Sequence, residues 1–259
     1  MTVALVTGAS RGIGRAIALQ LAEDGMDVGL NDVEVQRSEL EGVKKEIEAK
    51  GRKATIAIAD VTQEDQVKAM VASVVNELGE LNVMIANAGI IVTKKLFEVT
   101  VEEWDRVLAV NLRGVMLCYR EAGKQMVKQG KGGKIIGACS TAGYRPSTNA
   151  IAYTASKWAV RGLTQATALE LAQYDINVNA YCPGPVDTHM WKEIGASVSQ
   201  RTGVSPEEAF QQSVEARAAL KRPQEPEDIA NIVGFLASPK SRNITGQSIL
   251  VDAGMLRPD

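Results

Sequence analysis

Apolar runs and amphipathic stretches alternate along the chain, and this alternation predicts its elements. Residues 2–7 are apolar almost throughout and rich in β-formers, which is typical of a strand buried on both faces. Residues 12–24 then carry apolar positions at helical spacing, and Gly25 is a natural helix stop. The same reading predicts further strands at residues 27–32, 53–59, 82–86, 133–139, 177–182 and 247–251, and further helices at residues 35–50, 63–78, 101–129, 150–173 and 225–237.

Strict alternation of strands and helices predicts an α/β fold, in which helices cover both faces of a parallel sheet. No stretch has the composition of a linker, so we expect a single domain over residues 1–259. The rhythm breaks at about residues 188–221, which are helix-prone and contain no strand pattern. We expect this insertion to be a helical substrate lid, the alternative being a surface excursion that does not move.

Composition narrows the class of protein. Of the 259 residues, 45% are hydrophobic. The net charge of -2 gives no indication of a basic surface that would bind nucleic acid. No apolar run is long enough to span a bilayer, and the N-terminal residues lack the pattern of a secretory signal. The three cysteines are widely spaced and His189 is the single histidine, which favours free thiols in a reducing compartment and no metal site. We therefore expect a cytoplasmic protein that binds neither membrane nor nucleic acid.

A glycine-rich turn joins the first strand to the first helix. Gly8, Gly12 and Gly14 lie in this turn, at positions where a backbone can approach a phosphate closely. The N-terminus of the following helix would add free N–H groups and a partial positive charge. A plain tight turn is the alternative, but the flanking strand and helix favour a nucleotide site.

An acid follows the second predicted strand. In dinucleotide-binding folds, an acid about 20 residues past the glycines accepts hydrogen bonds from the adenosine ribose. Asp32 has this position, and it would repel a 2′-phosphate, so it favours NAD over NADP. Arg11 argues in the other direction, because a cation in the glycine turn could meet that phosphate. A helix-capping role for Asp32 is the structural alternative.

Tyr153 and Lys157 are four residues apart in a predicted helix, so they share one face. A free tyrosine hydroxyl has a pKa of about 10, which makes it a poor acid–base catalyst at neutral pH. A fixed ammonium beside it would lower that pKa and let it exchange a proton with a carbonyl or alcohol oxygen. Taken alone, such a pair is more often a feature of an ordinary surface helix.

These patterns together resemble the classical short-chain dehydrogenase/reductase family over almost the entire chain. The family's motifs occur in its order: Thr7-Gly8 with Gly12 and Gly14, Asn87-Ala88-Gly89, Asn111, Ser140, Tyr153 with Lys157, Pro183-Gly184, and Thr188. The resemblance implies a Rossmann-like, doubly wound sheet of about seven strands and a homotetrameric assembly. It also implies hydride transfer between NAD(H) and a carbonyl or alcohol.

The resemblance also implies roles for individual residues. Tyr153 would be the general acid–base, Lys157 would lower its pKa and bind the nicotinamide ribose, and Ser140 would hold the substrate oxygen. Asn111 would position a water in a proton relay. The implied cofactor-binding residues are Gly8, Ser10, Arg11, Gly12, Ile13, Gly14, Asp32, Asp60, Val61, Asn87, Ala88, Gly89, Tyr153, Lys157, Pro183, Gly184, Val186 and Thr188. The expected substrate pocket comprises Ser140, Thr141, Tyr144, Met190 and Trp191, the last three having an apolar core position as the alternative.

Within the family, the segments at residues 133–140, 181–194 and 245–255 most resemble acetoin/diacetyl reductases, the NAD-linked 2,3-butanediol dehydrogenases. This resemblance implies a small ketone or diketone as substrate. Thr141 and residues 144–150 differ from that pattern where substrate should lie. The alternatives are a 3-oxoacyl-thioester, sugar-alcohol or other carbonyl reductase of the same family and, from a different class, a non-catalytic NAD-binding protein. The presence of Ser140, Tyr153 and Lys157 disfavours the last.

Overall fold

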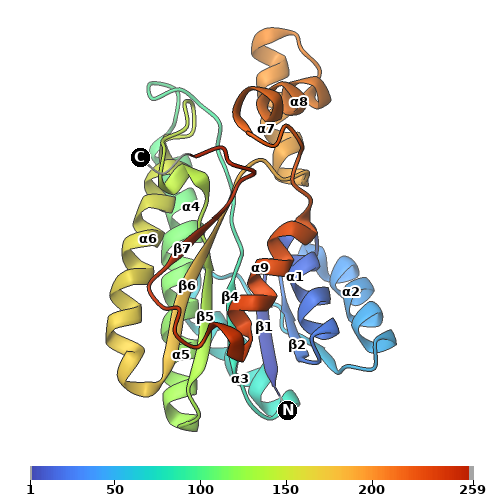
Figure 1. Cartoon of the computed structure of the whole chain (residues 1–259), viewed down its shortest axis with the longest axis vertical. Helices are drawn as coiled ribbons and strands as arrows, with labels where there is room; N and C mark the ends of the chain where they lie inside the picture. The colour runs from blue at the N-terminus through green and yellow to red at the C-terminus, as the bar shows by residue number, and fades with distance from the viewer. Residues whose placement is uncertain (1, 257–259) are drawn as a thin grey trace.

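The computed structural model describes residues 2–256 and contains one parallel sheet with the strand order β3-β2-β1-β4-β5-β6-β7 (Figure 1). The strands are β1 Val3–Thr7, β2 Asp27–Asn31, β3 Ala54–Ile56, β4 Val83–Ala86, β5 Gly133–Ala138, β6 Ile176–Pro183 and β7 Ser248–Val251. The predicted α/β class and Rossmann-like topology are confirmed. The order reverses direction at β1, so that β2 and β4 flank the first strand and leave a crevice beyond its carboxyl end.

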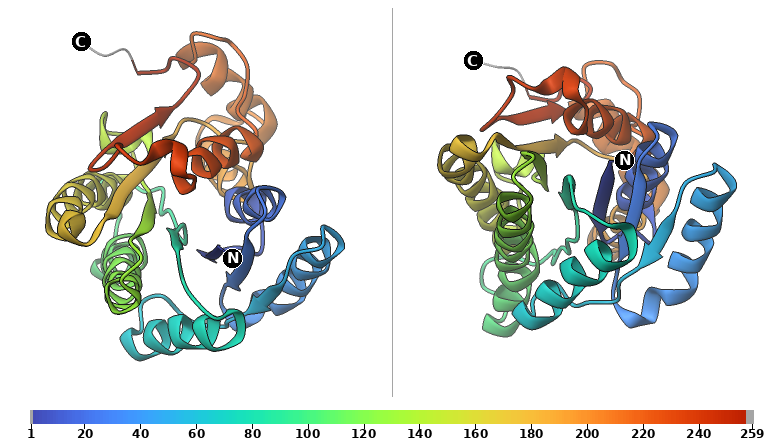
Figure 2. Two further views of the ribbon diagram at one scale, coloured as in Figure 1. Left: turned by 60° about the horizontal axis from the view of Figure 1, so that its bottom comes forward. Right: turned by 90° about the horizontal axis from the view of Figure 1, so that it is seen from below.

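Helices cover both faces of this sheet (Figure 2). They are α1 Gly12–Glu23, α2 Arg37–Ala49, α3 Glu64–Leu78, α4 Val101–Leu108, α5 Val115–Gln129, α6 Ile151–Leu171, α7 His189–Thr202, α8 Pro206–Arg217 and α9 Pro226–Ala237. Helices α1, α2 and α9 bury their apolar positions against one face of the sheet, and α3, α5 and α6 bury theirs against the other.

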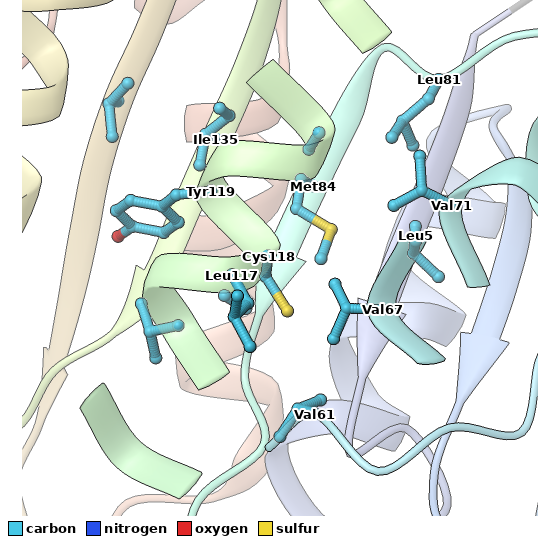
Figure 3. Packing of buried hydrophobic residues seen from close by; sticks show 14 of the residues in the cluster. Leu5, Val61, Val67, Val71, Leu81, Met84, Leu117, Cys118, Tyr119 and Ile135 are labelled. Atoms are coloured by element: carbon cyan, nitrogen blue, oxygen red, sulfur yellow. The ribbon is translucent and has the colours of Figure 1, made fainter. Parts of the chain in front are cut away.

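The two faces carry separate hydrophobic clusters because side chains alternate along each strand. In β1, Leu5 belongs to the cluster under α3 and α5, whereas Ala4 and Val6 belong to the cluster under α1 and α9. Figure 3 shows the first cluster, in which Met84 of β4 lies among Cys118 of α5 and Val67 of α3. Burial on both faces explains why the central strands read as continuous apolar runs.

Strand β3 is shorter than the predicted strand at residues 53–59. After Ile56, the side chain of Asn31 donates to the backbone carbonyls of Ala57 and Ala59, at 2.9 and 3.1 Å. The backbone N–H groups of Ala57 and Ala59 still donate to the carbonyls of Leu30 and Asp32. The carbonyls of Ala57 and Ala59, however, are bound by a side chain and not by a neighbouring backbone, so the regular ladder ends at Ile56.

The helical region predicted at residues 101–129 is present but not uniform. Thr100 and Glu103 form a capping box that starts α4, as N-terminal hydrogen-bonding pairs do. Between α4 and α5 lies a turn of π-helix, Ala109–Gly114, which contains the buried Asn111. Such turns are frequent at functional sites.

Helices α7 and α8 form the insertion at about residues 188–221, and they stand beyond the carboxyl ends of the strands (Figure 1). Gly203, with a φ of 75°, ends α7 in the left-handed conformation that glycine adopts easily. The rings of Trp191 and Phe210 join the two helices edge to face, with centroids 5.3 Å apart.

Within residues 2–256, we find no helix of the length and apolarity that crossing a membrane requires.

Candidate active site

A cavity of about 1100 Å³ opens at the carboxyl edge of the sheet, under α7 and α8. It brings together segments that lie far apart in the sequence. The predicted cofactor residues that line it are Gly8, Arg11, Gly12, Ile13, Gly14, Asp32, Asp60, Val61, Asn87, Ala88, Gly89, Tyr153, Lys157, Pro183, Gly184, Val186 and Thr188. Ser140, Thr141, Met190 and Trp191 line it as well, whereas Ser10, Asn111 and Tyr144 do not.

The glycine turn forms one wall of the cavity in a shape that other residues would not allow. Gly8 has a φ of 64°, and a Cβ on Gly14 would lie 2.0 Å from the carbonyl oxygen of Gly8. Helix α1 begins at Gly12 with no side-chain cap and no acid in its first turn. Its first N–H groups are therefore free to bind an anion, which fits the pyrophosphate of a dinucleotide.

Asn87 fixes the glycine turn to the middle of the sheet. Its side-chain amide donates to the carbonyls of Thr7 (2.8 Å) and Gly8 (3.2 Å), and its side-chain oxygen accepts from the hydroxyl of Tyr181 (2.7 Å). The hydroxyl oxygen of Thr7 accepts in turn from the backbone N–H of Asn87 and of Ala88. This network joins β1, β4 and β6 below the cavity.

Asp32 presents a fixed carboxylate at the end of β2. Its side chain accepts from the hydroxyl of Ser10 at 2.6 Å and from the backbone N–H of Val33 at 2.9 Å. Ser10 is buried and is not among the residues that line the cavity. Its hydroxyl is used to orient Asp32 instead.

Asn31 is a site residue that the sequence reasoning missed. It lines the cavity, and its side chain binds the segment that leads to Asp60 and Val61. Its position directly before Asp32 was an available signal, because a buried polar residue at a strand end must find partners.

Tyr153, Lys157 and Ser140 meet at the opposite end of the cavity. Lys157 Nζ lies 5.3 Å from the centre of the Tyr153 ring and donates to the carbonyl oxygen of Ala138 at 2.7 Å. The side chain of Ser140 hydrogen-bonds to Tyr153. Helix α6 supplies the first two residues and the segment just after β5 supplies the third, so the group exists only in the folded chain.

Burial controls the ionisation of this group. Removal from water raises the pKa of Tyr153 to about 12, and the hydrogen bond with Ser140 only partly opposes this. Burial likewise lowers the pKa of Lys157 to about 8, against the opposing effect of the nearby Cys139. The pKa of Tyr153 is therefore raised in the free protein, and not lowered as expected, because desolvation is the largest effect on it.

Asn111 lies behind this group and is fully buried. Its side-chain oxygen accepts from the N–H of Ile90, and its amide donates to the Ile90 carbonyl, both at 2.9 Å. A longer bond of 3.3 Å reaches Ser156 on α6. The carboxamide thus ties α6 to the segment after β4.

Tyr144, expected as a pocket wall, is not among the residues that line the cavity. Its hydroxyl donates to the carbonyl of Ser248 on β7, and its ring lies 3.7 Å below the guanidinium carbon of Arg161. Arg161 also donates to the carbonyl of Gly143 at 2.8 Å. The loop after Ser140 folds back onto the sheet here because this cation–π contact and the two hydrogen bonds favour it.

The lid supplies much of the remaining wall, which the sequence did not specify beyond Met190 and Trp191. The additional lining residues include Ile194, Val198, Arg201, Ala209, Gln212, Ser213, Ala216 and Arg217 from α7 and α8, and Met255 from the C-terminal segment. Most of these side chains are apolar, and apolar walls with a few polar groups are typical of small-molecule sites.

Comparison with known proteins gives consistent results. The family model for short chain dehydrogenase matches residues 2–199. A short-chain dehydrogenase/reductase of Armillaria gallica is 51% identical, over 98% of this chain and 95% of its own. L-2,3-butanediol dehydrogenase of Corynebacterium glutamicum is 41% identical over 98% of each chain. A 3-oxoacyl-acyl-carrier-protein reductase of Staphylococcus epidermidis is 42% identical over 97% of this chain and 98% of its own.

The fold has solved counterparts too. The crystal structure of a short-chain type dehydrogenase/reductase from Mycobacterium marinum superposes with a TM-score of 0.90 at 34% identity, covering 99% of this chain and 96% of that one. Fold and site together define an oxidoreductase that uses a nicotinamide cofactor. The chain belongs to the short-chain dehydrogenase/reductase family, as the resemblance in its motifs indicated.

Proposed function

We propose that this protein is an NAD(H)-dependent reductase and dehydrogenase that interconverts a small ketone or diketone, such as diacetyl or acetoin, and a secondary alcohol. One observation carries the proposal. Tyr153, Lys157 and Ser140 meet at one end of the cavity. The uncapped N-terminus of α1 and the carboxylate of Asp32 lie at its other end.

In the proposed reaction, the nicotinamide cofactor delivers or accepts the hydride when bound. Tyr153 gives its proton to the substrate oxygen as negative charge develops there, and takes it back in the oxidation of the alcohol. Ser140 donates a hydrogen bond to the same oxygen and fixes its position. Lys157 supplies positive charge beside Tyr153. Asn111 positions a water that links Lys157 to solvent in a proton relay.

The proposed preference for NAD over NADP rests on Asp32. A carboxylate held by Ser10 and Val33 suits two ribose hydroxyls, which donate, and opposes a 2′-phosphate, which carries the same charge. Arg11 also lines the cavity, so some use of NADPH would come from this residue.

The proposed substrate class rests on the relatives. The butanediol dehydrogenase and the 3-oxoacyl-acyl-carrier-protein reductase are almost equally identical to this chain, at 41% and 42%. The thioester is therefore the second candidate, and sugar alcohols or larger ketones follow. The Met190-Trp191 pair and the segment before Ser140 favour the small diketone, because they carry the resemblance to acetoin reductases.

We further propose a homotetramer in the cytoplasm, with α7 and α8 as a lid. Exposed apolar side chains on α6, including Trp158 and Leu169, are available for contacts between subunits. Three free cysteines are in keeping with a reducing compartment. Light scattering after size exclusion would test the assembly, and a monomer at micromolar concentration would refute it.

The first experiment is the initial rate of NADH oxidation with diacetyl, acetoin, an acetoacetyl thioester and a keto-sugar, each repeated with NADPH. The proposal expects fastest turnover on diacetyl or acetoin with NADH. Faster turnover on the thioester would replace the substrate class and leave the catalytic residues unchanged. No oxidation on any substrate would refute the assignment as a reductase of these carbonyls.

A further inference from the structure

Cys139 and Cys182 lie side by side at the ends of neighbouring strands. In the parallel ladder Ala138, the last residue of β5, pairs with Tyr181 of β6, so Cys139 and Cys182, the next residue of each chain segment, are level with one another. The backbone N–H of Cys139 donates to the Tyr181 carbonyl at 2.9 Å, which continues the ladder to this point. The two thiols lie close enough for each to shift the pKa of the other.

The spacing of neighbouring strands lies within the range that a disulfide spans. Neighbouring strands are about 4.7–4.9 Å apart, and disulfides join residues whose Cα atoms are about 4.4–6.8 Å apart. Side chains at paired positions also project from the same face of the sheet. Both thiols belong to the cluster under α3, α5 and α6, and both are free.

The thiol of Cys139 has the surroundings of a reactive cysteine. The neighbouring Cys182 and the charge of Lys157 lower the pKa of Cys139 against the opposing effect of burial. The S–H of Cys139 donates to the Lys157 carbonyl oxygen at 3.3 Å, which places the thiol beside the catalytic lysine. Cys139 also lines the cavity, through which a small oxidant can arrive. Low pKa and access together make a thiol oxidisable.

Cys118 provides the contrast within the same chain. It is buried on α5 in the same cluster, and burial raises its pKa to about 12. It does not line the cavity. Cys118 is therefore expected to be inert towards the oxidant that modifies the pair.

We propose that Cys139 and Cys182 form an oxidative modification site, which a peroxide closes to an internal disulfide and a dithiol reopens, and that closing it suppresses turnover. The Cys139 thiolate attacks one peroxide oxygen, breaks the O–O bond and becomes a sulfenic acid, with loss of water after protonation. The sulfur of Cys182 then displaces a second water and forms the S–S bond. In sum, two thiols are oxidised and one hydrogen peroxide is reduced to two waters.

The position of the bond explains its effect on turnover. Cys139 directly precedes Ser140, and Cys182 directly precedes Pro183-Gly184 in the cavity wall. A covalent bond draws the two side chains closer than a contact between free thiols does, so both strand ends must adjust. Displacements of about 1 Å near reacting groups reduce rates by up to about a hundredfold.

The test treats purified protein with hydrogen peroxide and follows three quantities: intact mass, free thiols in denaturant, and turnover. We expect a mass lower by two hydrogens, loss of two of three titratable thiols, and a fall in turnover of about tenfold to a hundredfold. Dithiothreitol should restore all three. The turnover readout rests on the proposed function, whereas mass and thiol count need no substrate.

Matched variants separate the pair from other oxidisable groups. Cys118→Ala should behave as the unmodified protein does, whereas Cys182→Ala should form no internal disulfide and should accumulate a sulfenic acid that dimedone traps. Three remaining thiols after peroxide, or a disulfide that includes Cys118 or joins two chains, would overturn the proposal. So would a loss of turnover that dithiothreitol leaves unrepaired, because that points to methionine oxidation at Met190 or Met255.

Discussion

The cavity has a floor, formed by the strand ends with the glycine turn, and a roof, formed by helices α7 and α8. Different interactions stabilise these two regions. In the floor, Asn87 joins the carbonyl groups of the glycine turn to the hydroxyl of Tyr181 through bonds of 2.7–3.2 Å. In the roof, the rings of Trp191 and Phe210 pack edge to face, and a long bond of 3.4 Å joins Ser197 on α7 to the Thr93 carbonyl. Directional bonds fix the first region, whereas less directional apolar contacts hold the second.

This difference indicates how the molecule divides its tasks. Proton and hydride transfer need reacting atoms in a narrow range of positions, and a buried polar network supplies that rigidity. Substrate entry and choice need a surface that moves and varies, and lids are drawn from regions with few directional bonds. Changes in the floor should therefore affect chemistry, and changes in the roof should affect substrate binding.

The largest effect is expected for Tyr153→Phe. Loss of the acid–base hydroxyl should lower kcat by about 10²–10⁴-fold, because general acid–base catalysis contributes about that much. Binding of NADH, measured by fluorescence, should change little. Tyr144→Phe is the matched control, since it removes a hydroxyl that binds Ser248 outside the cavity. Nearly full activity in Tyr153→Phe would contradict the assigned role.

The next largest effect concerns cofactor choice. Asp32→Ala removes the carboxylate that opposes a 2′-phosphate, and should shift the ratio of kcat/KM for NADPH over NADH by about 10–100-fold, which corresponds to about 1.4–2.8 kcal/mol. Arg11→Ala in the same background should reverse part of that gain. An unchanged ratio of kcat/KM for the two cofactors in Asp32→Ala would show that another group distinguishes the ribose from its 2′-phosphate.

The pH dependence should show opposite slopes for the two directions. Tyr153 keeps its proton at neutral pH, because burial raises its pKa to about 12. Oxidation of the alcohol must pass a proton to this group and on to solvent, so its rate should rise between pH 7 and 10. Reduction should decline above pH 8, where Lys157, with a pKa lowered by burial to about 8, loses its charge.

Steady-state rates at saturating cofactor would measure both profiles. Lys157→Arg keeps its charge over this range. It should therefore remove the decline in reduction, unless its larger side chain disrupts the site, which the Kd for NADH would reveal. A rate of reduction that stays constant to pH 10 in the unmodified protein would contradict the role of Lys157.

The smallest effects are expected in the roof. Trp191→Ala should raise KM for the ketone several-fold and leave kcat similar, because Trp191 lines the cavity but touches no reacting group. Phe210→Ala is the matched control, because it abolishes the same ring contact by changing a residue that does not line the cavity. Each should cost about 0.5–1.5 kcal/mol of the ring interaction in thermal unfolding. Equal KM values for both variants would assign the effect to lid stability alone.

The sequence predicted most of the fold, and the reason is local. Alternating apolar strands and amphipathic helices require burial on particular faces, and the element order then leaves few arrangements. The error at residues 57–59 and the unpredicted π turn at Ala109–Gly114 have another origin. The first depends on the side chain of Asn31, and the second on bonds between Asn111 and Ile90, which are 21 residues apart.

The sequence by itself determined the features that depend on residues close together in the chain. These are the glycine turn before a helix, Asp32 after a strand, and Tyr153 with Lys157 one helical turn away. What only the tertiary structure decided are properties that depend on distant neighbours. Arg161 and Ser248 hold Tyr144 away from the cavity, Ser10 turns towards Asp32, and burial rather than Lys157 controls the pKa of Tyr153. Short spacings follow from backbone geometry alone, whereas exposure, orientation and ionisation depend on which remote segments pack around each side chain.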